Sequence, residues 1–335
     1  MEMAEAFFVK SSWSLSSALD DYEKHWSVSE GSIPSYRSVR RSLVEPYLDD
    51  RPISSFDSYD IIEWRDALVD SDRAASYVNK ALAYLSGAFS YFVTAYGLAD
   101  NPVKGVGRVR EDFKEAPYFD EGDFSRLERL LVSGMADEST SKENVELRMT
   151  CFAAYTSLHF GLRCGEVCAL TRDDISITNE MIVRHNLVGN CGAPHIGPTK
   201  GRRARKFSCD DRQWREQYDR HLAFHKAWRG IPLSRGEPLI TFTGDWTRPG
   251  EVSARFSELR DLWGLPEDTH FHTLRHTHAT YSLGYLRQQP DMVSRRLGHA
   301  DVATTLRIYV HAIPAQDAQA AQDFGSMAKR LSEGL

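Results

Sequence analysis

Apolar residues recur at helical spacing through the first hundred residues of the chain. This spacing predicts four helices, over about 14–26, 35–41, 58–69 and 74–96. The longest of them is amphipathic, with one apolar stripe formed by Leu82, Leu85, Phe89 and Phe92. Asn101 and Pro102 are expected to break it, and a charged, Gly-containing stretch follows. We therefore predict three segments: an N-terminal extension over 1–11, a helical domain over 12–103 and a linker over 104–117.

The pattern after the linker is also mostly helical, with one change. Helices are predicted over 119–131, with Asp120 as its N-cap, and from the capping residue Asp211 to Trp228. Between them, short β-type runs predict one three-stranded sheet drawn from 175–177, 181–187, 195–198 and 206–209, with the Lys200–Arg205 turn at a hairpin tip. A short amphipathic helix is expected over the tail, 314–335. The expected fold class is mostly α with a small antiparallel sheet (α+β), in two domains, 12–103 and 118–313.

The last quarter of the chain holds a small set of groups suited to attack on a phosphodiester. His272, Arg275, His299 and Tyr309 occur in this order, inside HFHTLRHTHAT and RRLGHADVATTLRIYVH. An arginine binds a phosphate bidentately, imidazoles move or share protons, and a phenol is a nucleophile. No Gly-rich phosphate loop and no acidic metal cage accompanies them. The combination indicates phosphoryl transfer onto a protein tyrosine.

Local signals place these residues on helices. His272 and Arg275 are three residues apart at the start of a helix predicted to reach about Arg287, so they can face one side. Gly298 is a suitable left-handed end for a second helix. Asp301 is the expected N-cap of a third helix, over 302–311, which carries Tyr309 in its last turn and ends before Pro314.

These motifs resemble the conserved boxes of the tyrosine recombinases, the phage integrase family. LRHTHAT, followed by LGHAD and a tyrosine ten residues beyond that histidine, resembles the second box. TSLHFGLRCGEVCAL resembles the first box, which places its arginine at Arg163 and its acidic partner at Glu166. GPTKGRRARKFSC resembles the segment that carries the family's β-hairpin lysine, here Lys200. The resemblance covers roughly 117–313 strongly and the N-terminal part weakly.

The resemblance implies a role for each matched residue. Tyr309 would attack the scissile phosphate, while Arg163 and Arg275 neutralise its non-bridging oxygens. Lys200 would be the general acid for the leaving 5′-oxygen. His272 would be the general base or a phosphate donor, and His299 a donor to a non-bridging oxygen. Glu166 would orient these groups from behind. No ATP, metal or other cofactor is implied.

The resemblance also implies partners. The two domains would form a C-shaped clamp around double-stranded DNA with inverted-repeat core sites. Four protomers would join two duplexes, and a directionality factor is a possible further partner. The tail helix, 314–335, would dock onto a neighbouring protomer. Candidate DNA contacts are Arg37, Arg40, Arg41, Asn79, Lys80, Arg202, Arg203 and Arg205.

Composition constrains this picture in several ways. The formal net charge of −6 is unusual for a DNA-binding protein, but 190–207 carries five cations and no acid. No run of 18 apolar residues exists, and the first residues lack a signal-peptide pattern. Five cysteines without a C-x-x-C pair indicate free thiols in a reducing compartment. We therefore expect a cytoplasmic, nucleoid-associated protein with no membrane partner.

Several alternatives remain open on the sequence alone. Within the family, these are a Xer-type dimer-resolving recombinase and a DNA invertase. Others are a relaxing enzyme of the type IB topoisomerase kind and a non-catalytic DNA-binding regulator, against which the intact site argues. Zinc binding by Cys164 and Cys168, or by His272 and His276, is disfavoured, the latter because Arg275 would repel a dication. His270, His276 and His278 are expected to be structural hydrogen-bond donors.

Overall fold

The computed structural model describes residues 12–28, 30–111, 116–189, 193–199, 201, 203–299, 301–309 and 314–333. The chain divides into two compact units, Met1–Lys114 and Glu115–Leu335.

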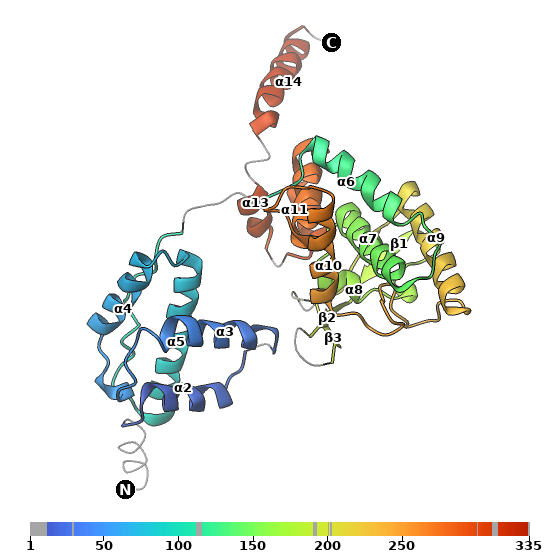
Figure 1. Cartoon of the computed structure of the whole chain (residues 1–335). Coiled ribbons are helices and arrows are strands. Elements are labelled where there is room, and N and C mark those ends of the chain that lie inside the picture. Colours follow the sequence, from blue (N-terminus) through green and yellow to red (C-terminus); the bar gives the residue numbers. More distant parts are fainter. Residues whose placement is uncertain are drawn as a thin grey trace. The chain divides into compact units, whose positions relative to one another are not determined.

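Unit 1 consists of helices around one apolar core (Figure 1). Its elements are α2 (Leu15–Lys24), η1 (Glu30–Ser32), α3 (Ile33–Val39), the π-helical turn η2 (Arg40–Val44), η3 (Ile53–Ser55), α4 (Ser58–Asp70) and α5 (Ala75–Tyr96). Ser14 caps α2, and Asp57 caps α4 together with Asp60 in a capping box. The predicted stripe of α5 faces the core. That helix ends at Gly97, whose φ of 68° is the left-handed conformation that glycine adopts without strain, in agreement with the predicted range of 74–96.

Part of the predicted linker packs on unit 1. The Asn79 side chain accepts from the backbone N–H of Val109 at 2.9 Å and donates to its carbonyl at 2.9 Å. Val106 and Val109 pack against the core of this unit. Asn79 is only 3% exposed, so its amide anchors this segment. This internal role removes Asn79 from the candidate DNA contacts.

The helix α7 (Lys142–Phe160) lies at the centre of unit 2. It packs against α6 (Glu121–Gly134), α9 (Arg212–Arg229), α10 (Pro249–Leu262) and α11 (Phe271–Thr280) (Figure 1). Buried side chains lie all around it, which explains why a one-sided apolar pattern did not reveal this helix. The predicted N-caps of the flanking helices are confirmed: Asp120 accepts from Asp123 N at 2.8 Å, and Asp211 from Trp214 N at 3.1 Å.

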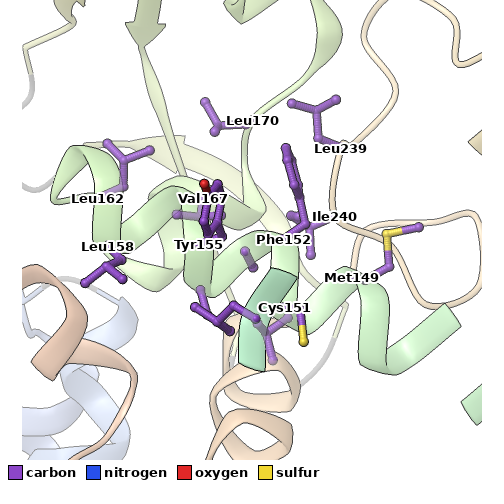
Figure 2. Close-up of a cluster of buried hydrophobic side chains, with 14 of the residues drawn as sticks. Met149, Cys151, Phe152, Tyr155, Leu158, Leu162, Val167, Leu170, Leu239 and Ile240 are labelled. Atoms are coloured by element: carbon purple, nitrogen blue, oxygen red, sulfur yellow. The ribbon is translucent and has the colours of Figure 1, made fainter. Parts of the chain in front are cut away.

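The core of unit 2 forms where α7 meets the short helix α8 (Cys164–Cys168) and the loop that contains Leu239 and Ile240. Figure 2 shows Phe152, Tyr155 and Val167 among the side chains gathered there. This core holds rigid the C-terminal end of α7, where the chain turns at Gly161 into the first conserved box.

Four short strands form two separate two-stranded antiparallel sheets: β1 (Glu180–Val183) with β4 (Arg205–Ser208), and β2 (His185–Val188) with β3 (His195–Pro198). The predicted single three-stranded sheet is therefore wrong. Residues 175–177 form no strand, apart from one bridge between Ile175 and Met181. Val183 pairs with Arg205 and His185 with Pro198, so β3 and β4 pair with different strands and do not form the hairpin that we expected. Lys200 and Arg202, which come between these two strands in the sequence, lie outside the described residues.

The remaining elements are η4 (Arg172–Asp174), η5 (Tyr281–Tyr285), α12 (Pro290–Leu297), α13 (Val302–Tyr309) and α14 (Pro314–Ser332). Gly298 ends α12 with a φ of 68°, as predicted. The fold class, mostly α with small antiparallel sheets, is confirmed. Over the part of the chain that the structure describes, no helix is both long and apolar enough to span a membrane.

Candidate active site

Arg163 and Glu166 are held together by the geometry of a helix start. Arg163 is the N-cap of α8, and Glu166, three residues later, accepts from the Arg163 backbone N–H at 2.9 Å. The Arg163 Nη1 also donates to Glu166 Oε1 at 2.9 Å. Glu166 is 1% exposed, whereas the Arg163 side chain is 21% exposed. A buried carboxylate thus fixes an arginine that solvent, and hence a phosphate, can reach.

Arg275 reaches the same place from α11. It is 1% exposed, and its Nη1 donates to the carbonyl of Gly161 at 2.8 Å. The same nitrogen lies 3.9 Å from Glu166 Oε2. Gly161 has a φ of 69°, and a Cβ there would meet Leu297 at 2.6 Å and a His278 ring atom at 2.7 Å. Only glycine therefore allows α11 and α12 to approach this carbonyl so closely.

His272 lies on α11 one turn before its partner ring, His276. The two ring centroids are 4.7 Å apart with an interplanar angle of 87°. Burial lowers the pKa of His272 to about 3, and the nearby His276, Arg275 and Arg163 contribute in the same direction. The His272 imidazole is therefore neutral at pH 7, so one ring nitrogen can donate a hydrogen bond and the other can accept one.

His299 directly follows Gly298, the residue that ends α12. Its Nδ1 lies 2.7 Å from the hydroxyl of Thr305, a fully buried residue of α13. Burial, and then the positive charges of Arg275 and Arg163, lower the pKa of His299 to about 4. Thr305 was missed in the sequence. It orients this ring from the helix that ends at Tyr309.

Two predicted catalytic residues, Tyr309 and Lys200, lie partly or wholly outside the described residues. Tyr309 is the last residue of α13, but its side chain lies outside the described part of the chain. Lys200 lies outside the described residues, between Thr199 and Gly201. Both of these neighbours line a cleft of ≈ 820 Å³ that His299 and Arg296 also line. The roles of Tyr309 and Lys200 therefore stay predictions.

The other histidines of this region have internal contacts. His278 Nδ1 lies 3.1 Å from the carbonyl of Leu158 and donates to it. His270 is the N-cap of α11, where its backbone N–H donates to the hydroxyl of Thr273 at 3.0 Å. The His278 contact ties α11 to α7, whereas the His270 contact caps the start of α11 itself.

Arg205 has an internal partner, contrary to our expectation of a DNA contact. Its side chain is 9% exposed and donates to Glu166 through both terminal nitrogens, at 3.0 and 2.7 Å. Of the other two candidates in this segment, Arg203 is exposed, and Arg202 lies outside the described residues.

Arg40 of unit 1 is likewise engaged internally. Its side chain is 11% exposed and forms ion pairs with Asp20 at 2.7 Å, Glu23 at 3.2 Å and Glu45 at 2.8 Å. A guanidinium with three carboxylate partners has little charge left for a phosphate, so Arg40 is also removed from the candidate contacts.

Of the remaining basic candidates of unit 1, Arg37 and Arg41 are exposed, whereas Lys80 is half-buried and donates to the Ser35 hydroxyl. Arg41 is exposed and donates to the carbonyl of Arg37 at 3.3 Å. The Arg37 side chain is 58% exposed, although it pairs with Glu23 at 3.1 Å. The Lys80 ammonium lies 5.3 Å from the centroid of the Tyr36 ring.

The two cysteines of the first box have internal contacts. Cys164 Sγ donates to the carbonyl of Pro249 at 3.3 Å. A hydrogen bond with Cys164, together with burial, raises the pKa of Cys168 well above its usual value, which disfavours the thiolate that a metal needs. Within the described ranges, no three His, Cys, Asp or Glu side chains are grouped to hold a metal ion.

Comparison with known proteins agrees with this geometry. Residues 132–316, more than half of the chain, match the model of the phage integrase family. The chain is similar to the integrase of Staphylococcus phage L54a, at 21% identity over 262 residues that cover 74% of each chain. It is also similar to a tyrosine recombinase of Thermosipho africanus, at 22% identity over 292 residues, 84% of this chain and 89% of the relative.

Solved structures show the same fold. The Tn1549 transposon integrase in complex with a circular intermediate DNA matches with a TM-score of 0.73 at 19% identity, covering 92% of this chain and 100% of that chain. A lambda integrase tetramer bound to a Holliday junction matches with a TM-score of 0.62 at 18% identity, covering 88% and 77%. The predicted family is confirmed: the chain belongs to the phage integrase family and is a tyrosine-type site-specific recombinase.

Proposed function

We propose that this recombinase integrates or excises a mobile DNA element, and that it cleaves and rejoins duplex DNA through a 3′-phosphotyrosyl intermediate. One observation carries the proposal. Arg163 and Arg275, from separate helices, meet at the buried Glu166. The similarity to a phage integrase and to a transposon integrase favours a mobile element as the substrate.

The Tyr309 oxygen attacks the scissile phosphorus and forms the phosphotyrosyl bond, while the bond to the 5′-oxygen breaks. Arg163 and Arg275 neutralise the charge that builds on the non-bridging oxygens. Such electrostatic stabilisation of the transition state is usually the largest single contribution to catalysis. His299 donates to a non-bridging oxygen.

Two further groups move protons. The neutral His272 takes the tyrosine proton or donates to the phosphate; its pKa of about 3 keeps the ring uncharged at pH 7, which favours the donor role over that of a base. Lys200 gives a proton to the leaving 5′-oxygen. The phosphotyrosyl ester conserves the energy of the phosphodiester, so a 5′-hydroxyl from another duplex can reverse the step without ATP.

DNA is the substrate partner in this proposal. Arg37, Arg41, Lys80 and Arg203 are the described cations that stay candidates for phosphate contacts. The lambda integrase tetramer bound to a Holliday junction supports an assembly of four protomers. Two duplexes with inverted-repeat core sites are the further part of this proposal. A directionality factor and association with the nucleoid remain parts of the proposal.

The proposal predicts a circular form of the element. Cells that carry the gene and its flanking DNA should yield the junction of the element's two ends by PCR, and cells in which the gene is deleted should not. If neither strain yields the circular form and deletion of the gene causes chromosome multimers to accumulate, the protein is instead a dimer-resolving recombinase. Loss of inversion of a flanking segment would indicate an invertase.

The tail is the second testable part. On α14, Phe324, Met327 and Leu331 are 67%, 45% and 72% exposed at helical spacing. We propose that this face docks on a second copy, because exposed apolar patches mark interaction sites. Truncation after Pro314 should spare binding of one half-site but weaken assembly of two duplexes, as measured by light scattering. Gln322→Ala, a polar change on the same helix, is the control, and unchanged assembly after truncation would reject docking.

A further inference from the structure

Arg205 donates hydrogen bonds from all three of its guanidinium nitrogens. It begins β4 and donates to both oxygens of Glu166, with Nη1–Oε1 at 3.0 Å and Nη2–Oε2 at 2.7 Å. Its Nε donates to the carbonyl of Arg296 at 2.6 Å. A bidentate, buried arginine–carboxylate pair is strong and directional.

Glu166 is saturated by this arrangement. Oε1 accepts from Arg163 Nη1 and Arg205 Nη1, and Oε2 accepts from the Arg163 backbone and Arg205 Nη2. Each oxygen thus has two donors, which matches its two lone pairs. Arg275 Nη1 remains at 3.9 Å from Oε2, beyond hydrogen-bond distance.

Burial alone would raise the pKa of Glu166. Arg205 opposes burial most strongly, followed by Arg163 and Arg275, and together they hold the pKa at about 2. The carboxylate is therefore charged at neutral pH. A buried carboxylate that lost one cation would draw more strongly on the two that remain.

We propose that Arg205 is a positioning residue that satisfies Glu166, and so keeps the guanidinium groups of Arg163 and Arg275 available to the scissile phosphate. This inference rests on the proposed catalytic roles of those two arginines. Without Arg205, the Glu166 carboxylate lacks two donors and attracts the Arg275 guanidinium more strongly, so part of the charge of Arg275 is lost to the reaction.

A purely mechanical role is the rival explanation. Arg205 also ties β4 to the end of α12, where a Cβ on Gly298 would lie 3.0 Å from its Nη1. Its loss could therefore displace His299 by loosening this contact. The two explanations differ in what happens when the charge of Glu166 is removed as well.

The test is a charge-rescue experiment under single turnover, on a nicked duplex that carries the junction of the element's two ends. Arg205→Met should slow covalent adduct formation about tenfold to a hundredfold, the scale seen for residues that orient the ligands of metal sites. The double variant Arg205→Met/Glu166→Gln should be several-fold faster than Arg205→Met, because no carboxylate then competes for Arg275. A mechanical role predicts that the double variant is as slow as the single one, or slower.

The chain offers a matched control outside the site. Arg229 forms a bidentate pair with Glu237, at 2.9 and 2.8 Å, near the end of α9. Arg229→Met should leave the rate of adduct formation within about twofold of wild type, because substitutions away from a special site have small effects. Thermal unfolding will show whether Arg205→Met is folded. If it is not, a second pair of variants is compared: Arg205→Lys, which keeps the charge, should retain more activity than Arg205→Gln.

The outcomes separate the two proposals. If the wild-type protein forms no adduct on this duplex, the proposed function fails. If wild type forms the adduct and Arg205→Met does so equally fast, or the double variant shows no recovery, the inference about Arg205 is wrong. In the second arm, equal rates for Arg205→Lys and Arg205→Gln would also overturn it.

Discussion

Tyr309→Phe should abolish covalent attachment of the protein to DNA while DNA binding persists. The change removes one oxygen, which in the proposed mechanism is the atom that forms the phosphotyrosyl bond. We expect adduct formation to fall by roughly 10⁴-fold or more, the scale seen when a nucleophile is removed from a hydrolase. The measurement is a DNA-linked band on a denaturing gel after incubation with a nicked duplex that carries the element's junction.

Affinity for that duplex, and its dependence on salt, should be unchanged, because the phenol contributes no charge to the DNA interface. Tyr285→Phe is the matched control, since Tyr285 is 70% exposed and belongs to the π-helical turn after α11. An adduct formed by Tyr309→Phe would place the nucleophile on another residue.

Lys200→Ala should cleave a normal oxygen ester slowly, yet recover most of its rate when the bridging 5′-oxygen is replaced by sulfur. A positioned general acid is worth roughly 10²–10⁴ in rate, and it matters only when the leaving group needs a proton. A thiolate leaves readily without one because its conjugate acid is far stronger than an alcohol. Single-turnover cleavage of the two substrates by the same variant measures this difference.

Two kinds of control variant test the role of Lys200: changes to the two arginines that act on the phosphate, and a change to a nearby lysine with another partner. Arg163→Ala and Arg275→Ala should stay slow on both substrates, because these residues act on the non-bridging oxygens. Lys206→Met should be close to wild type on both, since its ammonium pairs with Glu180 at 2.7 Å on the neighbouring strand. Equal defects of Lys200→Ala on oxygen and sulfur substrates would mean that the lysine only anchors the phosphate.

Much of the fold and of the candidate site could be predicted from the sequence, because the relevant signals are local. Asp120 and Asp211 each cap a helix by binding a backbone N–H three residues ahead, so residue type and spacing suffice to predict them. Gly298 ends α12 for a similarly local reason, its left-handed backbone. The order and spacing of the boxes around Arg163 and Arg275 were enough to indicate the family. The central helix α7 was not predicted, because its buried residues follow no one-sided pattern.

Only the tertiary structure decided which polar side chains bind other parts of the protein and which are exposed to solvent. In the sequence, Arg203 and Arg205 are two similar cations of one basic segment. In the structure, one is exposed, and the other meets a carboxylate 39 residues away. Asn79 is committed to a backbone segment 30 residues on in the same way. The pairing of β4 with β1 is equally non-local, which is why the expected hairpin around Lys200 was wrong. Composition and spacing report the chemistry that a side chain offers, but its partner depends on which distant elements pack beside it.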